Sequence, residues 1–482
     1  MQAATPSLHN LKLSTKSMPL PSSNASKILI SQIRLQYYRR SYASLTSKQQ
    51  NVSHVPSTPS RRTLQTLPTT TLVRSLVVLS ATALPARLLA SLIRLTKKHV
   101  GIIESVGPLR WTFKKLLYDN FCIGFEENEI RAKTQELRRI GFTGIVLANA
   151  REAQPTTDSH VGSVIGDVQC EEWVNNNLES VQQAEPGDYI GLRFTGAGAA
   201  AAKFLSDFSA TCKSHSPEEA CKLYFSEMQY FVSQVERICK AAEARQIRVL
   251  IDAESSTYQM AIDCAALRAL VLNTYQMYLN SSADKLKSHL NHSMKNGYVL
   301  GIKMVRGAYL HTELDKQSLH VSKQQTDEAY DDTVRFLLRE GSGAAWKADV
   351  MLATHNAKSV RQAFDLYTSI YMTSKEDYRL RPQICGVAFA QLMGMADEVS
   401  MELVNKIEQA KKQESTKRMT EVDSTNVYPR LGVYKYTAWG SLRDCLLYIL
   451  RRAEENKDAA ARTQDTAFTI LRELRSRVLN RT

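Results

Sequence analysis

Short, nearly continuous apolar runs alternate with helical stretches from about residue 110 onward, and this alternation limits the fold more than any other feature. The runs are Thr143–Ala148, Asp188–Phe194, Arg248–Asp252, Ala269–Asn273, Leu300–Val305, Asp349–Ala353, Gln383–Phe389 and Gly432–Tyr436. Continuous apolar runs are typical of parallel strands that are covered by helices. The eight β/α alternations predict an α/β protein with a (β/α)8 TIM-like barrel, and an open doubly wound sheet is the alternative.

Helical patterns lie between the runs, for example over Ser226–Gln246 and Asp327–Arg339. Two polar insertions interrupt the alternation, at residues 150–187 and at Asn405–Val427, and we expect surface loops or short helices there. The turn Gly196-Ala-Gly198 loosely matches a dinucleotide-binding loop. The next strand ends much too far away to supply the acid that such a fold requires, so we interpret the turn as a plain β/α connection.

The net positive charge of the chain belongs to its N-terminal segment. The formal charge is +14, but 14 of the 62 basic residues and none of the 48 acidic residues precede Glu104, which leaves 48 of each in the remainder. This balance argues against a nucleic-acid partner for the folded body. A long acid-free segment rich in Ser, Thr, Arg and Leu is typical of a mitochondrial transit peptide, and a disordered basic tail is the alternative.

We therefore expect a disordered targeting leader over residues 1–70, an N-terminal helical region over residues 71–135 and a catalytic barrel over residues 136–475. The apolar stretch Leu72–Leu95 contains several arginines and Pro85, and it is too short to span a bilayer. A helix on a membrane surface and a packed helix of the body fit this stretch equally well.

Polar side chains follow the predicted strands. A TIM barrel collects its functional residues at the C-terminal ends of its strands. The strand-end residues are Asp252, Glu254, Asn273, Tyr275, Gln276, Arg306, Tyr309, Thr354, His355, Asn356 and Tyr436. His289 and His292 lie instead in a Lys-rich stretch without suitably spaced ligand partners, so we expect solvated histidines and no metal site.

Two adjacent arginines, Arg451 and Arg452, end the apolar helical run Leu446–Leu450. The planar guanidinium group binds a carboxylate in a bidentate manner, so two of them side by side suggest a clamp for a small anion. Glu455 lies one helical turn after Arg451 and can hold its guanidinium in place. For the pair alone, a simple complement to the helix dipole is the better explanation, and the rest of the chain reverses that preference.

Several blocks of the chain resemble the proline dehydrogenase family. They are Ile251–Ser256, Asn273–Gln276, Gly301–Leu310, Ala353–Asn356, Gln391–Asp397 and Tyr436 with Arg451–Asn456. The blocks occur in the order of the family and cover roughly residues 110 to 470. Together with the acid-free leader, they make the chain similar to mitochondrial, fungal-type members.

The resemblance implies noncovalent FAD on a (β/α)8 barrel, oxidation of L-proline to Δ1-pyrroline-5-carboxylate and transfer of the electrons to a membrane quinone. It also implies a location on the matrix side of the inner mitochondrial membrane, as a peripheral protein. A hydroxyproline dehydrogenase and a non-catalytic barrel that binds proline are the alternatives. Hydride transfer to a flavin needs no protein nucleophile, and the sequence shows no evident one.

The resemblance also assigns roles to residues. Arg451 and Arg452 would clamp the proline carboxylate, Glu455 would orient them, and Tyr436 and Leu392 would pack on the proline ring. Arg193 stands at the position of a substrate-binding lysine and would pair with Asp252, while Lys303 would approach the reactive edge of the flavin. The remaining flavin-lining positions are Asn273, Arg306, Ala308, Tyr309, Leu310, Thr354, His355 and Asn356. Arg193 and Lys303 depart from the usual residue types but keep the charge, and Ala438 replaces a common proline.

We predict that residues 1–70 direct a soluble reporter into mitochondria and are shortened there, because the segment is basic and acid-free. Acidic substitutions at Arg34, Arg39 and Arg40 should impair import if the cationic face matters. Fractionation and immunoblotting of the reporter measure both effects. A cytosolic reporter of full length would contradict the assignment.

Overall fold

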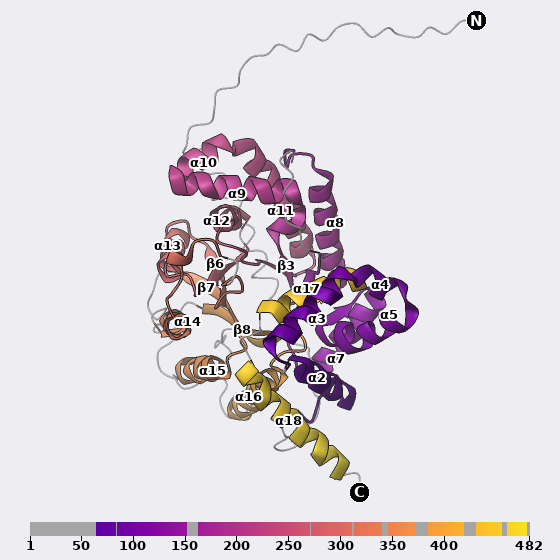
Figure 1. Ribbon diagram of the computed structural model, residues 1–482. Coiled ribbons are helices and arrows are strands. Elements are labelled where there is room, and N and C mark those ends of the chain that lie inside the picture. Colours follow the sequence, from indigo (N-terminus) through magenta and orange to yellow (C-terminus); the bar gives the residue numbers. More distant parts are fainter. Residues whose placement is uncertain are drawn as a thin grey trace, which may run out of the picture.

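The computed structural model describes residues 64–82, 84–151, 162–269, 271–310, 313–339, 346–371, 384–418, 430–455 and 460–479. Eight of its nine parallel strands close into a barrel, in the order β2 to β9, with β9 paired to both β8 and β2. The strands are β2 (Gly144–Asn149), β3 (Tyr189–Leu192), β4 (Arg248–Ile251), β5 (Leu272–Gln276), β6 (Val299–Val305), β7 (Lys347–Ala353), β8 (Ile384–Leu392) and β9 (Arg430–Trp439). The predicted (β/α)8 barrel is confirmed, and the open sheet is excluded (Figure 1).

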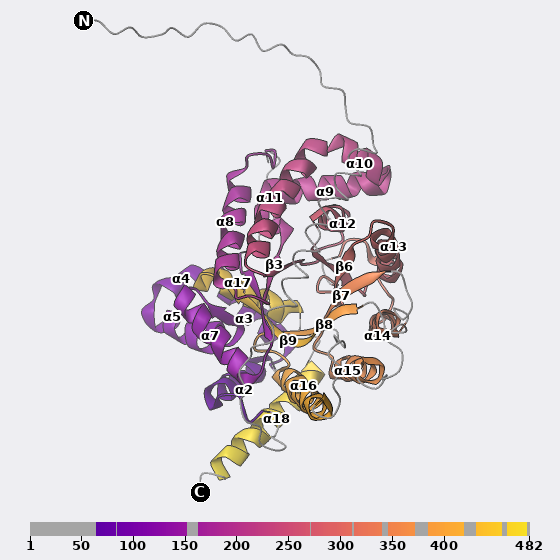
Figure 2. The same ribbon diagram turned by 180° about the vertical axis from the view of Figure 1, so that it is seen from behind.

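Helices cover the outside of the barrel, as the apolar outer faces of its strands require. They are α7 (Glu127–Ile140), α8 (Val168–Gln183), α9 (Ala199–Ser214), α10 (Pro217–Leu223), α11 (Phe225–Ala244), α12 (Gln259–Ala269), α13 (Ser282–Lys295), α14 (Lys323–Arg339), α15 (Ala357–Tyr371) and α16 (Asp397–Arg418). The predicted helices at 226–246 and 327–339 correspond to α11 and α14. Seen from behind, α13 to α16 follow one another around one side of the barrel (Figure 2).

Three local predictions need correction. The fourth strand begins at Leu272, because α12 extends to Ala269, so that Asn273, Tyr275 and Gln276 lie within β5 instead of following a strand. The first polar insertion contains a full helix, α8, and the second begins within the long helix α16, where we expected loops or short helices. A short additional strand, β1 (Cys122–Gly124), pairs with the end of β9 at Ala438 and Trp439.

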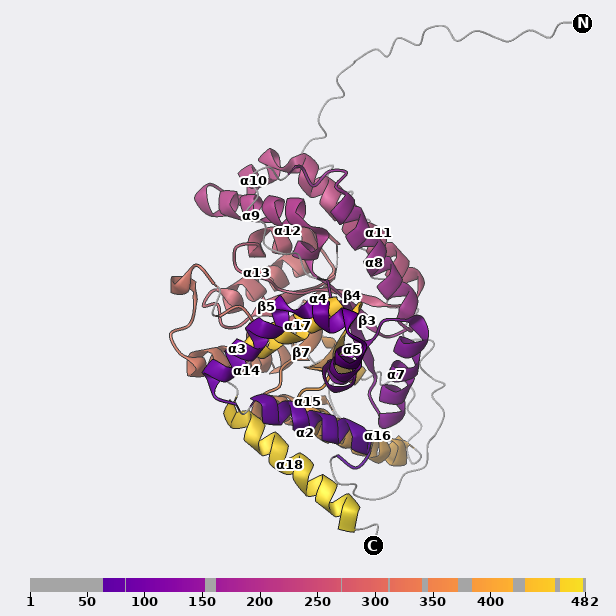
Figure 3. The same ribbon diagram turned by 45° about the vertical axis from the view of Figure 1, so that its right-hand side comes forward.

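The N-terminal helical region packs on the barrel. It contains α2 (Thr69–Thr82), α3 (Ala86–Lys98), α4 (Val100–Ser105), α5 (Gly107–Phe113), the π-helix η1 (Lys114–Tyr118) and α6 (Asp119–Phe121). Helices α3 and α4 pack against α17 (Leu442–Glu455), the helix that follows β9. Figure 3 shows α2 lying beside α18 (Ala460–Leu479).

The folded body begins before the predicted leader boundary at residue 70. Leu64 and Leu67 are buried in the core, with 2% and 6% of their surfaces exposed. Arg477 of α18 donates to the Leu64 carbonyl at 2.9 Å and to the Thr69 hydroxyl at 2.8 Å. The rest of the predicted leader lies outside the described residues. Among the helices of the described ranges, none is both long and apolar enough to cross a bilayer.

A buried charge cluster closes the N-terminal end of the barrel. The Asp349 carboxylate, 3% exposed, accepts from Arg248 at 3.1 Å and from Arg430 at 3.3 Å. The Arg248 guanidinium also stacks on the Tyr189 ring at 4.0 Å. Gly386 leaves room for the carboxylate, since a Cβ there would lie 2.8 Å from an Asp349 oxygen. These ion pairs join β4, β7 and β9 across the interior.

We predict that Asp349→Ala destabilises the protein by about 3–5 kcal/mol, because it leaves two arginines without their buried counter-charge. The matched control is Asp332→Ala, which removes an exposed i,i+3 pair with Arg335 and should cost at most about 1 kcal/mol. Urea unfolding followed by circular dichroism measures both. Equal losses in the two variants would contradict the stabilising role of the cluster.

Candidate active site

Asp252 lies at the centre of the charged group at the C-terminal end of the barrel. Its carboxylate accepts from the Lys303 ammonium at 2.5 Å and from the Tyr436 hydroxyl, and the Arg193 Nε lies 3.5 Å away. The four side chains come from the ends of β3, β4, β6 and β9, and each is at most 9% exposed. The Lys303 ammonium also lies 4.9 Å from the centre of the Tyr436 ring.

Two opposing effects act on the Asp252 carboxyl. Burial raises its pKa, but the charges of Lys303 and Arg193 and the hydrogen bonds from Lys303 and Tyr436 outweigh burial and lower it below the ordinary value. Burial raises the pKa of Tyr436 well above its ordinary value. Asp252 is therefore ionised and Tyr436 is a protonated donor at neutral pH.

Glu254 adds a second buried carboxyl, 4% exposed. It accepts from the backbone of Thr195 at 3.0 Å and from the hydroxyl of the same residue. Burial raises its pKa, against lowering contributions from these hydrogen bonds and from the charges of Arg193 and Arg451. Its main-chain carbonyl accepts from the Gln276 amide at 2.9 Å.

The predicted arginine pair reaches this end of the barrel. The guanidinium carbon of Arg452 lies 5.5 Å from the centre of the Tyr448 ring, and that of Arg193 lies 5.1 Å from the same ring. Arg451 is placed 4.9 Å from the centre of the Tyr309 ring. Burial raises the pKa of Tyr309 to about 12, although the nearby arginines oppose the rise. Arg451 therefore contacts the loop after β6, a position that dipole complementation alone does not explain. The ring beside Arg452 belongs to its own helix, and Arg193, which follows β3, lies on the same ring.

Leu392 and His355 meet beside this cluster. The backbone N–H of Leu392 donates to His355 Nε2 at 3.1 Å, and the Leu392 side chain packs against the inner barrel core that includes Tyr436. Glu455 ends α17, but its side chain lies outside the described residues.

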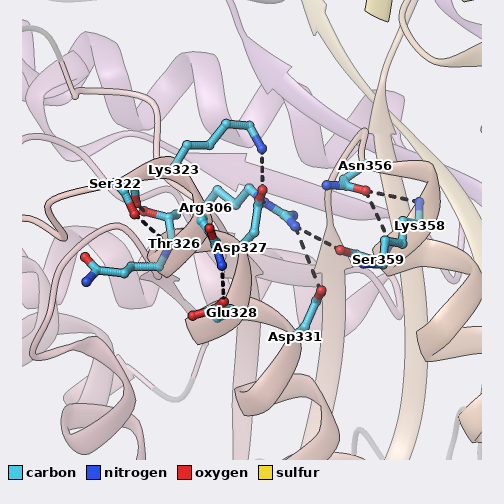
Figure 4. Close-up of polar contacts among 12 residues, drawn as sticks. Arg306, Ser322, Lys323, Thr326, Asp327, Glu328, Asp331, Asn356, Lys358 and Ser359 are labelled. Carbon is cyan, nitrogen blue, oxygen red and sulfur yellow. Dashed lines mark hydrogen bonds and ion pairs between the residues drawn. The ribbon is translucent and has the colours of Figure 1, made fainter.

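Several predicted flavin-lining residues also hold neighbouring elements in place (Figure 4). The Arg306 guanidinium contacts Asp327 at 2.5 Å, Thr354 at 2.8 Å and Ser359 at 2.8 Å. The Asn356 side chain accepts from the first backbone N–H groups of α15. These contacts attach the ends of β6 and β7 to α14 and α15.

Asn273 faces α12, where its amide donates to Asp263 at 2.8 Å. Ala308 is half-buried, and Leu310 is 49% exposed. The turn that carries them starts at Gly307, whose φ is +129° and where a Cβ would lie 1.6 Å from the Tyr278 ring. Only glycine fits this close approach. The flavin roles of all these residues stay predictions.

The sequence did not reveal Tyr448, Thr195 or Glu313. Tyr448 lies within the apolar run before the arginines and looked like part of its body. Glu313 is 2% exposed and accepts from the Tyr278 hydroxyl at 2.6 Å and from the Ser256 backbone at 2.9 Å, so it joins the loops after β4 and β6. No sequence signal marks a contact of this kind.

The structure also shows where the glycine turn and one of the two histidines set aside in the sequence analysis lie. The Gly198 turn opens α9, and the N–H of Ala199 donates to the Gln169 side chain at 3.0 Å, as befits a plain connection. We expected His289 to be solvated, and this prediction is wrong. His289 is half-buried and lies 2.8 Å from the Tyr275 hydroxyl.

A parallel β/α barrel with charged and aromatic side chains at the C-terminal ends of its strands defines the class of TIM-barrel enzymes. The model of the family "Proline dehydrogenase" matches residues 133–465. The chain therefore belongs to the proline dehydrogenase family, whose members are oxidoreductases, and the predicted family and enzyme class are confirmed.

Curated relatives agree. The chain is 24% identical to proline dehydrogenase 1, mitochondrial, of Dictyostelium discoideum, over 80% of this chain and 69% of that protein. It is 28% identical to the probable proline dehydrogenase, mitochondrial, of Schizosaccharomyces pombe, over 52% of this chain and 51% of that protein. It is also 28% identical to the hydroxyproline dehydrogenase of Rattus norvegicus, over 53% of each. The chain thus spans about half the length of the latter two.

Among solved structures, the fold is similar to that of proline utilization A (PutA) from Bdellovibrio bacteriovorus inactivated by N-propargylglycine. The TM-score is 0.53 at 12% identity, over 89% of this chain and 41% of that one. At this identity the likeness supports the barrel fold alone.

We predict that Asp252→Asn destabilises the protein by about 3–5 kcal/mol at pH 7, because Lys303 and Arg193 lose their buried counter-charge. The folded-state pKa of Asp252 is lowered, so its stabilisation is present above the unfolded pKa of about 3.9 and is lost as the pH falls through the folded value. The decline of stability below about pH 4 should therefore be shallower in the variant.

Urea unfolding across this pH range measures the difference. Asp284→Asn is the matched control. The Asp284 side chain is 87% exposed, and its carboxylate lies as far as 4.0 Å from the Lys287 ammonium, so its ion pair is weak. The same stability and the same acid slope in Asp252→Asn and wild type would refute the central position of this carboxylate.

Proposed function

We propose that this chain oxidises L-proline to Δ1-pyrroline-5-carboxylate with bound FAD and a membrane quinone as the electron acceptor. The observation that carries the proposal is the cluster of Asp252, Lys303, Tyr436 and Arg193 at the strand ends, beside the arginines of α17. Membership in the proline dehydrogenase family supports the reaction type.

The substrate carboxylate would be bound by Arg451 and Arg452. Both lie near the C-terminal end of α17, and each contacts an aromatic ring that limits its orientation. A guanidinium that is already oriented loses less side-chain entropy when it binds a carboxylate. The Tyr436 ring and the Leu392 side chain, which belong to one apolar cluster, would pack against the carbons of the proline ring. Glu455 keeps its predicted role of orienting the arginines.

The same charges act on the substrate amine. The cations Arg193, Lys303 and Arg451 act on the carboxyls of Asp252 and Glu254, Arg452 adds a fourth charge near Tyr309, and burial raises the pKa of Glu254. The site is therefore biased toward positive potential, which lowers the pKa of a bound amine. A neutral amine is the form from which a hydride can leave the adjacent ring carbon. The chain's own contribution is thus to bind and orient the substrate and to favour the neutral form of its amine, whose proton leaves to water.

The residues at the strand ends fit FAD. Lys303 provides a buried cation beside Tyr436, and residues 308–310 follow Gly307 in the turn after β6, the strand that carries Lys303. Arg306, Thr354, His355, Asn356 and Tyr309 lie around this face and would hold the cofactor, together with Asn273 through its strand. When bound, FAD supplies the hydride acceptor, which no side chain of the protein replaces. A cation at Lys303 favours the extra negative charge that this acceptor gains.

We place the protein on the matrix side of the inner mitochondrial membrane. The names of the Dictyostelium and Schizosaccharomyces relatives include the word mitochondrial. Helix α3 exposes Leu88 and Leu95, each 58% exposed, and carries Lys97 and Lys98 in its last turn. An apolar face with flanking cations suits peripheral binding to an anionic bilayer.

Hydroxyproline is the second candidate substrate, since the rat relative is named for it. A ring hydroxyl would meet the Tyr436 phenol, whose own hydroxyl is already bonded to Asp252. Because the Tyr436 hydroxyl is used in this hydrogen bond, it is not available to a substrate hydroxyl, and we therefore favour proline as the substrate.

Incubating the purified chain with FAD, an artificial quinone and either amino acid tests the proposal. Mass spectrometry should find a cyclic imine that has lost two hydrogen atoms from proline, formed at least tenfold faster than the product from hydroxyproline. Faster turnover of hydroxyproline would reassign the substrate, and binding without any imine would support the non-catalytic alternative.

We predict that Arg451→Met and Arg452→Met each raise the KM for proline at least about 30-fold while FAD is retained, because truncating one partner of a buried charge pair costs about 2–5 kcal/mol. Methionine keeps an apolar stem of similar length and removes the charge. Arg443→Met, an exposed position on the first turn of α17, is the control and should change KM little. An unchanged KM in both α17 end variants would rule out the clamp.

A further inference from the structure

A cavity of about 420 Å³ lies between the N-terminal helices and the C-terminal end of the barrel. Helices α2, α3, α5, η1 and α6 line one side of it, and α17 with the segment after β8 lines the other. Its volume falls within the range of small-molecule sites in proteins.

The cavity runs from the candidate active site to the surface. His355, Leu392, Tyr448 and Arg452 line one part of it, and the site described above contains the same residues. Val77 and Leu92 also line it, and these side chains are 45% and 47% exposed. A molecule in the cavity can therefore contact both the proline site and the surroundings of the protein.

The wall is mostly apolar, and several of its polar groups are engaged in hydrogen bonds or ion pairs, while the Asn120 amide nitrogen has no partner among the described residues. The hydroxyl of Ser75 donates to Asn120 at 3.4 Å, and that of Thr96 donates to the Leu92 carbonyl at 2.8 Å. Asp397 binds the Lys435 ammonium at 2.7 Å. Such a wall does not suit the diphosphate of FAD or a zwitterion such as proline. It suits an apolar chain whose polar end lies near Arg452 and Tyr448.

The outer end of the cavity lies beside the apolar face of α3. Leu88, Leu92 and Leu95 form an exposed row on this helix, and Leu92 is also part of the cavity wall. The face that suits a bilayer and the opening of the cavity thus share a residue. A molecule dissolved in the bilayer can enter without crossing water.

We infer that this cavity binds the electron acceptor, a quinone with an apolar side chain, with its head group beside Tyr448 and Arg452 and its chain between Val77 and Leu92. The inference rests on the proposed function and adds a place for the acceptor. The redox step balances, because proline loses two electrons and two protons as the imine forms, and a quinone takes up two of each to become the hydroquinone.

Ile93→Trp is the test variant. Ile93 is 3% exposed, lines the cavity and packs against Leu450, so an indole there reduces the space. Leu88→Trp is the matched control on the same helix, because its side chain is 58% exposed and does not line the cavity. Leu92→Asp is a second variant that folding should tolerate, since its side chain is half exposed; it places a charge at the opening.

The first readout is binding of a decyl-chain benzoquinone to the full chain in detergent, measured by calorimetric titration with decanol as a probe that lacks the head group. We expect Ile93→Trp and Leu92→Asp to weaken quinone binding at least tenfold, Leu88→Trp to leave it unchanged, and decanol to bind wild type at least tenfold more weakly. Equal quinone affinity in all four proteins, or equal affinity for decanol and quinone in wild type, would overturn the inference.

The second readout compares acceptors. The kcat/KM for the decyl quinone should fall at least tenfold in the two cavity variants, while a water-soluble dye and the bleaching of the flavin band by proline are unaffected. Equal losses with the dye and the quinone would overturn the assignment of the cavity. Failure of proline to bleach the flavin in wild type would refute the proposed reaction instead, and the binding titration would still decide the inference.

Discussion

The ionised carboxylate of Asp252 is the interaction on which the rest of the site depends. It accepts from Lys303 and Tyr436 and faces Arg193, so one anion collects side chains from three other strands of the barrel. Without it, two buried cations would repel each other in a medium of low dielectric constant. Because Tyr436 and Arg193 would also contact the substrate, the geometry of the binding pocket follows from this carboxylate.

Each end of the barrel contains a buried aspartate that is paired with cationic side chains, but the two clusters have different roles. At the N-terminal end, Asp349 binds Arg248 and Arg430 in a closed cluster that joins strands. At the C-terminal end, Asp252 pairs with Lys303 and Arg193, and α17 adds Arg451 and Arg452 beside the rings of Tyr309 and Tyr448, so four cations share this end with the carboxyls of Asp252 and Glu254. The excess positive charge suits an anionic substrate and a cofactor that gains negative charge. This division agrees with the general rule that one end of a TIM barrel serves stability and the other serves function.

Much of the fold was readable from the sequence, because buried parallel strands are continuous apolar runs and eight of them alternate with helices. The errors have physical reasons. The sequence from Ala269 to Val271 is more apolar than β5 itself, so the apolar pattern placed the strand too early in the chain. Strand β1 is only three residues long. Asp252 was identified because strand ends meet in a barrel, and Lys303 and Arg193 were identified through the family resemblance. Tyr448 and Glu313 depend on how α17 and a loop fold back, which no local pattern records.

The most direct test of the account is an anaerobic titration of the flavin absorbance with L-proline, in the wild type and in Asp252→Asn. The account predicts that proline bleaches the flavin band of the wild type, and that the variant keeps its flavin but needs at least tenfold more proline for half-bleaching. A flavin band in the wild type that does not respond to proline would contradict the proposed reaction. A variant that titrates like the wild type would contradict the central role of the Asp252 carboxylate.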